Sequence, residues 1–175
     1  LFDAARCVAV APSDTGPALV ALEAEMVISR NGKTRNVSAE KFFIGPAIDI
    51  TRMTVLEKGD ILTEIGVPKK WAGAKQYFEK IADREAWDFA LVNIAMVAKI
   101  SGGKVSDVRM ACGGVQCTPR RLTNVESLMK GEKIGAEMET LAKRVAARGA
   151  KALNYNHFKI PLMGSLAARA VRSLA

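Results

Sequence analysis

The chain has 175 residues, 49% of them hydrophobic, so it can bury a core of ordinary size and extensive disorder is excluded. Residues 1–66 hold seven basic and nine acidic residues, whereas residues 67–175 hold nineteen and nine, which leaves the excess of positive charge in the second part. The basic residues are dispersed and aromatic residues make up only 6%, so we expect no nucleic-acid partner. Apolar runs are too short for a membrane span, and we therefore expect a cytoplasmic protein.

The first elements that the sequence predicts are a short helix and a β-hairpin. Residues 12–24 begin with a turn and continue as an Ala/Leu run, with Ser13 or Asp14 available as the helix N-cap. Residues 26–37 have apolar strand-like segments on both sides of Asn31-Gly32. This dipeptide tolerates the positive φ angles of a type I′ turn, so a tight hairpin is predicted.

The middle of the chain predicts further strands. Residues 61–67 alternate as a strand does, and strand pattern and charge balance both change at residues 68–70, which is the best candidate for a domain boundary. Residues 76–82 predict a strand. The apolar run 90–100 fits a strand or a buried helix on periodicity alone, and the Gly-Gly turn before the strand-like run 105–113 favours a hairpin.

Three helices are predicted after the hairpin. Thr123 and Glu126 have the spacing of a capping box, and Gly131 is a typical stop. Residues 134–149 place apolar side chains on one helical face, and a last helix is expected from about Pro161, with basic residues near its end. Strands with segregated helices indicate an α+β fold, not a doubly wound sheet.

Residues capable of chemistry are few. His157, the one histidine, lies in a predicted loop, where a surface role is the more common one. Cys7, Cys112 and Cys117 have neither a disulfide-framework nor a zinc spacing, and Cys112 and Cys117 are best read as small buried residues. The charged segment 83–88 is an exposed loop or a lid over a ligand. We therefore predict no catalytic residue and no metal ligand in this chain.

Several segments together carry a resemblance to a known family. They are Pro12-Ser13-Asp14-Thr15, the strand 61–68 after Gly59-Asp60, the stretch 78–90, Gly113-Gly114-Val115 with Pro119-Arg120-Arg121, and Lys159-Ile160-Pro161-Leu162. In this order the chain resembles the FAD-binding medium subunit of molybdenum hydroxylases, the family of xanthine dehydrogenase and aerobic carbon monoxide dehydrogenase. The resemblance implies that residues 1–67 belong to the second FAD-binding subdomain. Residues 72–175 would then be the C-terminal domain, a small antiparallel sheet with three helices.

The resemblance also implies a function and site residues. Such a subunit receives electrons from an iron–sulfur subunit, which took them from a molybdopterin subunit, and passes them through FAD to an acceptor. Asp14 would lie beside the flavin, Leu62 would line its surroundings, and Lys80 would reach it as a positively charged donor. Arg84 and Asp88 would lie in a flavin-facing loop where the acceptor approaches. An exposed turn Asp, a core Leu and a surface Lys remain the ordinary alternatives.

The sequence departs from the family at the phosphate side of the cofactor. The family binds the FAD pyrophosphate with two glycine-rich loops, because glycine lets backbone N–H groups approach phosphate, and the first glycine here is Gly16. We therefore expect a C-terminal portion of the subunit, which alone binds FAD weakly or not at all. The alternative is a non-catalytic assembly module that contacts the iron–sulfur and molybdopterin subunits without bound flavin. The oligomeric state stays open.

Overall fold

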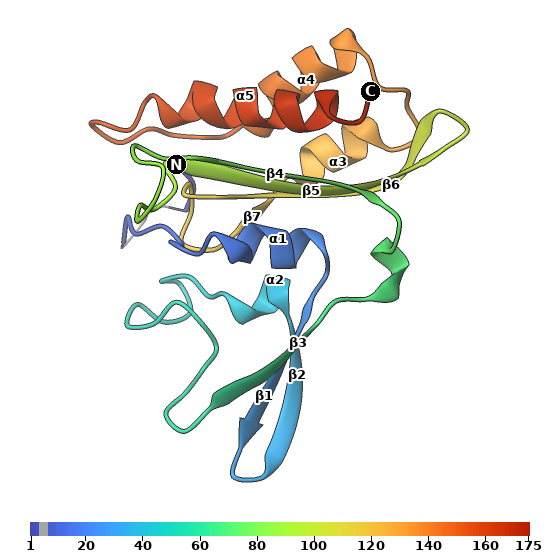
Figure 1. The fold of residues 1–175 in the computed structure, drawn as a ribbon. Coiled ribbons are helices and arrows are strands. Elements are labelled where there is room, and N and C mark those ends of the chain that lie inside the picture. Colours follow the sequence, from blue (N-terminus) through green and yellow to red (C-terminus); the bar gives the residue numbers. More distant parts are fainter. Residues whose placement is uncertain (4–6) are drawn as a thin grey trace.

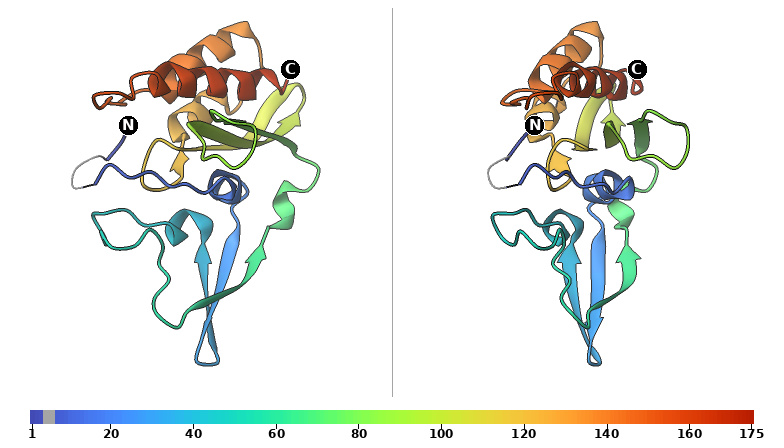
Figure 2. Two further views of the ribbon diagram at one scale, coloured as in Figure 1. Left: turned by 60° about the vertical axis from the view of Figure 1, so that its left-hand side comes forward. Right: turned by 90° about the vertical axis from the view of Figure 1, so that its left-hand side faces the viewer.

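The computed structural model describes residues 1–3 and 7–175 and arranges them in layers (Figure 1), which both views of Figure 2 show equally. A four-stranded sheet lies at the centre, with three helices on one face and the first two helices on the other. A three-stranded sheet lies beyond those two helices. The fold is thus the predicted α+β arrangement with antiparallel sheets.

The three-stranded sheet has the order β2-β1-β3 and is antiparallel throughout. Its strands are β1 (Glu25–Arg30), β2 (Lys33–Ser38) and β3 (Ile61–Gly66). Asn31 and Gly32 join β1 to β2 with φ angles of 50° and 75°, as a type I′ turn requires. The predicted hairpin is therefore confirmed, and the strand expected at 61–67 is present.

The four-stranded sheet has the order β4-β5-β6-β7, again antiparallel. Its strands are β4 (Lys75–Ile81), β5 (Val92–Ser101), β6 (Lys104–Gly113) and β7 (Arg120–Arg121). β5 is buried on both faces: Ile94 and Met96 face the C-terminal helices, while Ala95 and Val97 pack on the side of the first helix. This double burial explains a continuous apolar run without alternation, and it decides for a strand over a buried helix.

The helices supply most of the remaining core. They are α1 (Thr15–Ala21), α2 (Ala39–Phe42), α3 (Thr123–Met129), α4 (Ala136–Ala146) and α5 (Lys159–Arg172), with a 3-10 turn at Lys69–Trp71. Met129, Met163 and Leu166 from α3 and α5 are fully buried against the four-stranded sheet, and each such side chain contributes roughly 1.5–3 kcal/mol. No helix within residues 1–3 and 7–175 has the length and apolarity needed to cross a bilayer.

Two details of the helices differ from the prediction. The capping box is wrong: Thr123 is the first residue of α3, and the Glu126 carboxylate instead accepts a hydrogen bond from the Met110 main-chain N–H of β6, at 2.9 Å. α5 begins at Lys159, two residues before the predicted start, so Pro161 lies inside its first turn, where no N–H donor is needed. The domain division at residues 68–70 stays a prediction.

Candidate functional site

Two of the residues singled out in the sequence meet at the edge of the four-stranded sheet. Lys80 Nζ, at the end of β4, donates to Asp14 Oδ2 at 2.7 Å and to the main-chain oxygen of Asp88 at 2.6 Å. Asn93 Nδ2, at the start of β5, donates to Asp14 Oδ1 at 3.3 Å. Each carboxylate oxygen of Asp14 is thus held by one donor, although 66 residues separate Asp14 from Lys80.

The local sequence explains why Asp14 is free for these contacts. Ser13 Oγ accepts the Gly16 N–H at 3.0 Å and so satisfies the start of α1, while Asp14 makes no cap hydrogen bond. Lys80 and Asn93 are direct partners in the β4–β5 pairing, and side chains opposite each other in a sheet share a face. The strand register therefore places both donors on the same side, where α1 begins.

Asn93 is a member of this site that the sequence analysis missed. It is 1% exposed, and its Oδ1 is buried without a hydrogen-bond partner among the described residues. A buried acceptor left unpaired costs about 1–3 kcal/mol, so packing alone does not favour this residue. Its signal was present in the sequence, because Asn93 is the one polar residue between Ala90 and Ala98.

Gly113 makes room for the Asn93 amide. It is opposite Asn93 in the β5–β6 pairing, and a Cβ at this position would lie 2.4 Å from Asn93 Oδ1 and 3.1 Å from Pro17 Cγ of α1. Any larger residue must displace the amide or the helix. The glycine thus allows Asn93 and α1 to approach closely enough to hold Asp14.

The Asp14–Lys80 pair is partly open to solvent. The Lys80 side chain is 26% exposed and that of Asp14 is 44% exposed. Ion pairs with this exposure contribute about 0–1 kcal/mol to stability. The pair therefore contributes little to holding the fold together.

The loop between β4 and β5 is closed by Asp88. Asp88 Oδ2 accepts the main-chain N–H groups of Asp83 and Arg84 at 2.9 and 3.0 Å, and the hydrogen bond from Arg84 is the main cause that lowers the pKa of Asp88. The Arg84 guanidinium donates to the main-chain oxygen of Trp87. Trp87 itself has a φ of 57° and is 94% exposed, so the loop presents an indole ring to solvent.

Leu62 lies in the other sheet. It is opposite Ile28 in the β1–β3 pairing and packs, half-buried, on the cluster of Met26, Ile28 and Phe42. The structure therefore groups Asp14, Lys80 and Asp88 but gives Leu62 a place in a separate apolar cluster. Its role beside a flavin stays a prediction, as do those of the four polar residues.

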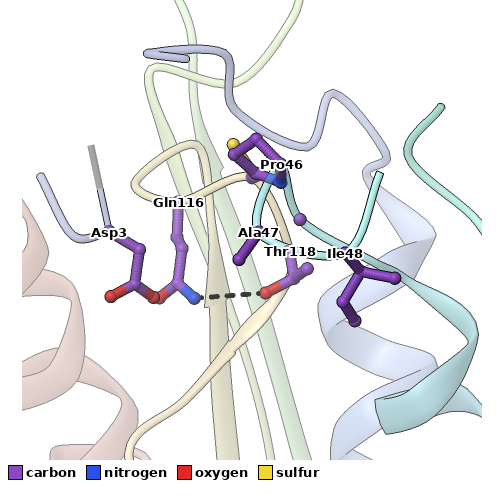
Figure 3. A pocket seen from close by; sticks show the side chains of 8 residues that line it. Asp3, Pro46, Ala47, Ile48, Gln116 and Thr118 are labelled. Atoms are coloured by element: carbon purple, nitrogen blue, oxygen red, sulfur yellow. Dashed lines mark hydrogen bonds between the residues drawn. The ribbon is translucent and has the colours of Figure 1, made fainter. Parts of the chain in front are cut away.

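A cavity of about 580 Å³ opens near the start of α1 (Figure 3). It is lined by Asp3, by residues 45–48 and by residues 116–118. Gly16 of α1 lies against residues close in sequence to this lining, because a Cβ on Gly16 would lie 2.9 Å from Pro119 Cγ and 3.2 Å from Phe43 Cζ. The volume falls in the range of about 300–1,000 Å³ that small-molecule sites have.

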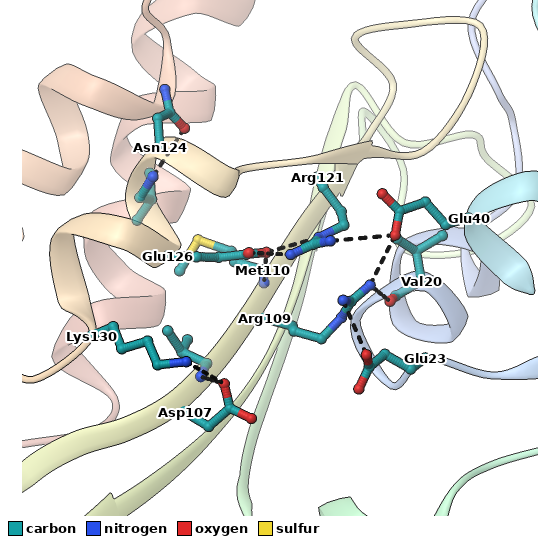
Figure 4. A network of polar contacts seen from close by, with 12 residues as sticks. Val20, Glu23, Glu40, Asp107, Arg109, Met110, Arg121, Asn124, Glu126 and Lys130 are labelled. Atoms are coloured by element: carbon teal, nitrogen blue, oxygen red, sulfur yellow. Dashed lines mark hydrogen bonds and ion pairs between the residues drawn. The ribbon is translucent and has the colours of Figure 1, made fainter.

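A network of ion pairs ties the elements around the site together (Figure 4). Arg109 of β6 donates to Glu23 at 3.2 Å, to Glu40 at 3.1 Å and to the main-chain oxygen of Val20 at 3.0 Å. Arg121 of β7 bridges Glu40 and the buried Glu126. The network fixes α1 and α2 on the four-stranded sheet, and its long-range pairs leave no local sequence pattern.

The cysteines and the histidine considered in the sequence analysis lie outside the Asp14–Lys80 site. Cys112 and Cys117 are buried, as predicted, and burial raises the pKa of Cys112 to about 12. His157 lies in an exposed turn before α5. Within residues 1–3 and 7–175, the acidic, Cys and His side chains form no cluster of three or more that would hold a metal ion.

Comparison with known proteins gives two family matches. Residues 7–70 match the FAD binding domain in molybdopterin dehydrogenase, and residues 76–174 match the CO dehydrogenase flavoprotein C-terminal domain. Among curated proteins, the chain is 33% identical over 142 residues to the glyceraldehyde dehydrogenase medium chain of Sulfolobus acidocaldarius, covering 81% of this chain and 47% of that one. It is 34% identical over 127 residues to the carbon monoxide dehydrogenase medium chain of Hydrogenophaga pseudoflava, covering 72% of this chain and 42% of that one.

A solved structure gives the same result. A chain of carbon monoxide dehydrogenase from Hydrogenophaga pseudoflava superposes with a TM-score of 0.80 at 29% identity, over 93% of this chain and 56% of the other. This chain thus spans about half the length of the relatives that it matches. It belongs to the CO dehydrogenase flavoprotein family, whose C-terminal domain matches residues 76–174, after residues that match an FAD binding domain of molybdopterin dehydrogenases.

Proposed function

We propose that this chain is part of the flavin-binding subunit of a molybdenum-containing oxidoreductase and that Asp14 and Lys80 contact its FAD. The observation that carries the proposal is the meeting of these two side chains, from distant parts of the sequence, at a solvent-open position on the edge of the four-stranded sheet. When bound, FAD supplies the electron transfer that no side chain of the protein supplies by itself.

The described residues fit such a cofactor in part. Lys80 provides a cation that stabilises negative charge on a flavin or on its phosphates. Asp14 accepts hydrogen bonds from ligand donors and keeps Lys80 in place, and Asn93 orients Asp14 from beneath. The buried Asn93 amide, with its unpaired Oδ1, and the glycine that accommodates it at position 113 are not needed for apolar packing, and they are consistent with a polar site.

The proposal extends to the residues around the pair. Leu62 excludes water from the flavin surroundings, and Arg84 and Asp88 shape the loop at which the electron acceptor approaches. In the complex, electrons pass from molybdopterin and iron–sulfur subunits through FAD to that acceptor. The similarity to proteins named as medium chains supports partner subunits, and the basic excess of residues 67–175 suits docking against acidic ones.

Isolation of the tagged chain from its native host tests the proposal. We expect it to bring down partner subunits that carry iron and molybdenum, together with acid-extractable FAD in near-equal amount to the chain. Partners without flavin would overturn the cofactor role and favour the assembly module. Flavin without such partners would contradict the proposed complex.

A further inference from the structure

Two cysteines that are distant in sequence lie against the same residue, Ala9, and one of them, Cys117, lines the cavity. Cys7 precedes α1, and Cys117 lies in the loop between β6 and β7. The Ala9 N–H donates to Cys7 Sγ at 3.4 Å, and the Cys117 thiol donates to the Ala9 main-chain oxygen at 2.9 Å. Burial, and after it the neighbouring Cys7 thiol, raise the pKa of Cys117, which agrees with this proximity. Both sulfur atoms therefore lie against the main chain of the same residue.

Main-chain hydrogen bonds hold the two segments in this position. The Ala11 N–H donates to the Gln116 oxygen at 2.9 Å, so the segment before α1 runs beside the loop that carries Cys117. Gly45 covers the other side, since a Cβ there would lie 3.8 Å from Cys117 Cβ. One main-chain hydrogen bond and the packing of Gly45 thus hold Cys117 beside the segment that carries Cys7.

The surroundings give small thiol reagents access to this pair. Cys7 is half-buried, and Cys117, although only 6% exposed, lines the cavity of about 580 Å³. Cys112 differs from both: it is 0% exposed within the main core. The chain therefore contains one reachable thiol pair and one thiol enclosed in the core.

We propose that Cys7 and Cys117 form a reversible disulfide that links residues 7–14 covalently to the loop between β6 and β7. With oxidised glutathione as the oxidant, the Cys7 thiolate attacks one sulfur of glutathione disulfide, and the first glutathione leaves as a thiolate. Cys117 then loses its proton and attacks Cys7 Sγ, which releases the second glutathione. The two cysteines are oxidised, and one glutathione disulfide is reduced to two glutathiones.

The order of these steps follows from the two environments. Cys7 is the more accessible thiol and meets the reagent first. Burial raises the pKa of Cys117, so Cys117 acts as the resolving thiol once the mixed disulfide is held next to it. This modification does not depend on flavin binding.

Thiol counting and peptide mapping under non-reducing conditions test the proposal on the purified chain treated with oxidised glutathione. We expect the loss of two of the three free thiols and a linked peptide pair that contains Cys7 and Cys117, with Cys112 still free. Dithiothreitol should restore all three. Separate glutathione adducts on Cys7 and Cys117 that persist, or a linkage that includes Cys112, would overturn the proposal.

Two variants and a denatured control sharpen the result. Cys117→Ser should stop at one glutathione bound to Cys7, whereas Cys7→Ser should leave Cys117 largely unmodified. In guanidinium chloride all three thiols should react, which shows that the folded structure makes the selection. Equal modification of Cys112 in the folded chain would refute that selection.

Discussion

Replacement of Gly113 by alanine tests how the polar site is built. The added Cβ would lie 2.4 Å from Asn93 Oδ1 and 3.1 Å from Pro17 Cγ, both far inside van der Waals contact. Overpacking of this kind in a core costs about 1–3 kcal/mol, because neighbouring groups leave their preferred positions. We therefore expect Gly113→Ala to lower the free energy of unfolding by about 2 kcal/mol.

The double variant separates this clash from a general loss of strand stability. Asn93→Ala removes the carbonyl that the new methyl group meets, so Gly113→Ala should cost about 1 kcal/mol less in that background, within the range of coupling between contacting residues. Urea unfolding followed by circular dichroism measures both differences. Gly66→Ala is the matched strand control, because its Cβ would meet nothing closer than 3.9 Å. Equal costs in the two backgrounds would refute the packing argument.

Three further changes probe the surrounding structure. Glu126→Ala leaves the Met110 N–H and Arg121 without their buried acceptor, so we expect a loss of about 3 kcal/mol in urea unfolding, and a loss below 1 kcal/mol would contradict the ion-pair network. Hydrogen bonds from Arg35 lower the folded pKa of Asp60 to about 2, so the stability that it contributes is present above its ordinary pKa of 3.8 and is lost as pH falls toward 2. Asp60→Asn should flatten that part of the stability–pH curve, and an unchanged slope would refute the assignment. Trp87→Gly relieves a φ of 57° at a side chain that is 94% exposed, so thermal unfolding should show unchanged or slightly higher stability, whereas a clear loss would mean that the indole packs on the fold.

Local sequence patterns were enough to predict most helices and strands. The polar site could not be predicted in this way, because its residues interact with partners that are distant in the sequence. Asn31-Gly32 predicted its hairpin because a two-residue turn is determined by its own backbone. The capping box failed because β6 and β7 supply stronger partners for Glu126 than its own helix does. Asn93 was missed because its meaning depends on strand register, which places it opposite Lys80 and Gly113.

The other candidate site residues were predicted from the family resemblance alone. Nothing in the spacing of Asp14 and Lys80 predicts that they meet, yet the structure brings them to 2.7 Å. The same resemblance grouped Leu62 with them, whereas in the structure Leu62 is a residue of the three-stranded sheet and packs against Met26, Ile28 and Phe42. An apolar side chain makes no directional contact that would indicate a role facing a ligand. The role of Leu62 therefore has to be tested in a complex with bound FAD.

Titration of the purified chain with FAD, followed by flavin fluorescence, tests the central claim most directly. The account predicts weak but saturable binding, which Lys80→Ala weakens roughly tenfold or more, since a charge-assisted hydrogen bond contributes about 1.5–3 kcal/mol. Lys104→Ala, which removes the same charge from the exposed first residue of β6, should leave the affinity unchanged. Equal affinities of the Lys80→Ala and parent chains would contradict the assignment of Asp14 and Lys80 to the flavin site. No saturable binding would contradict flavin binding by this chain alone and would favour the assembly module.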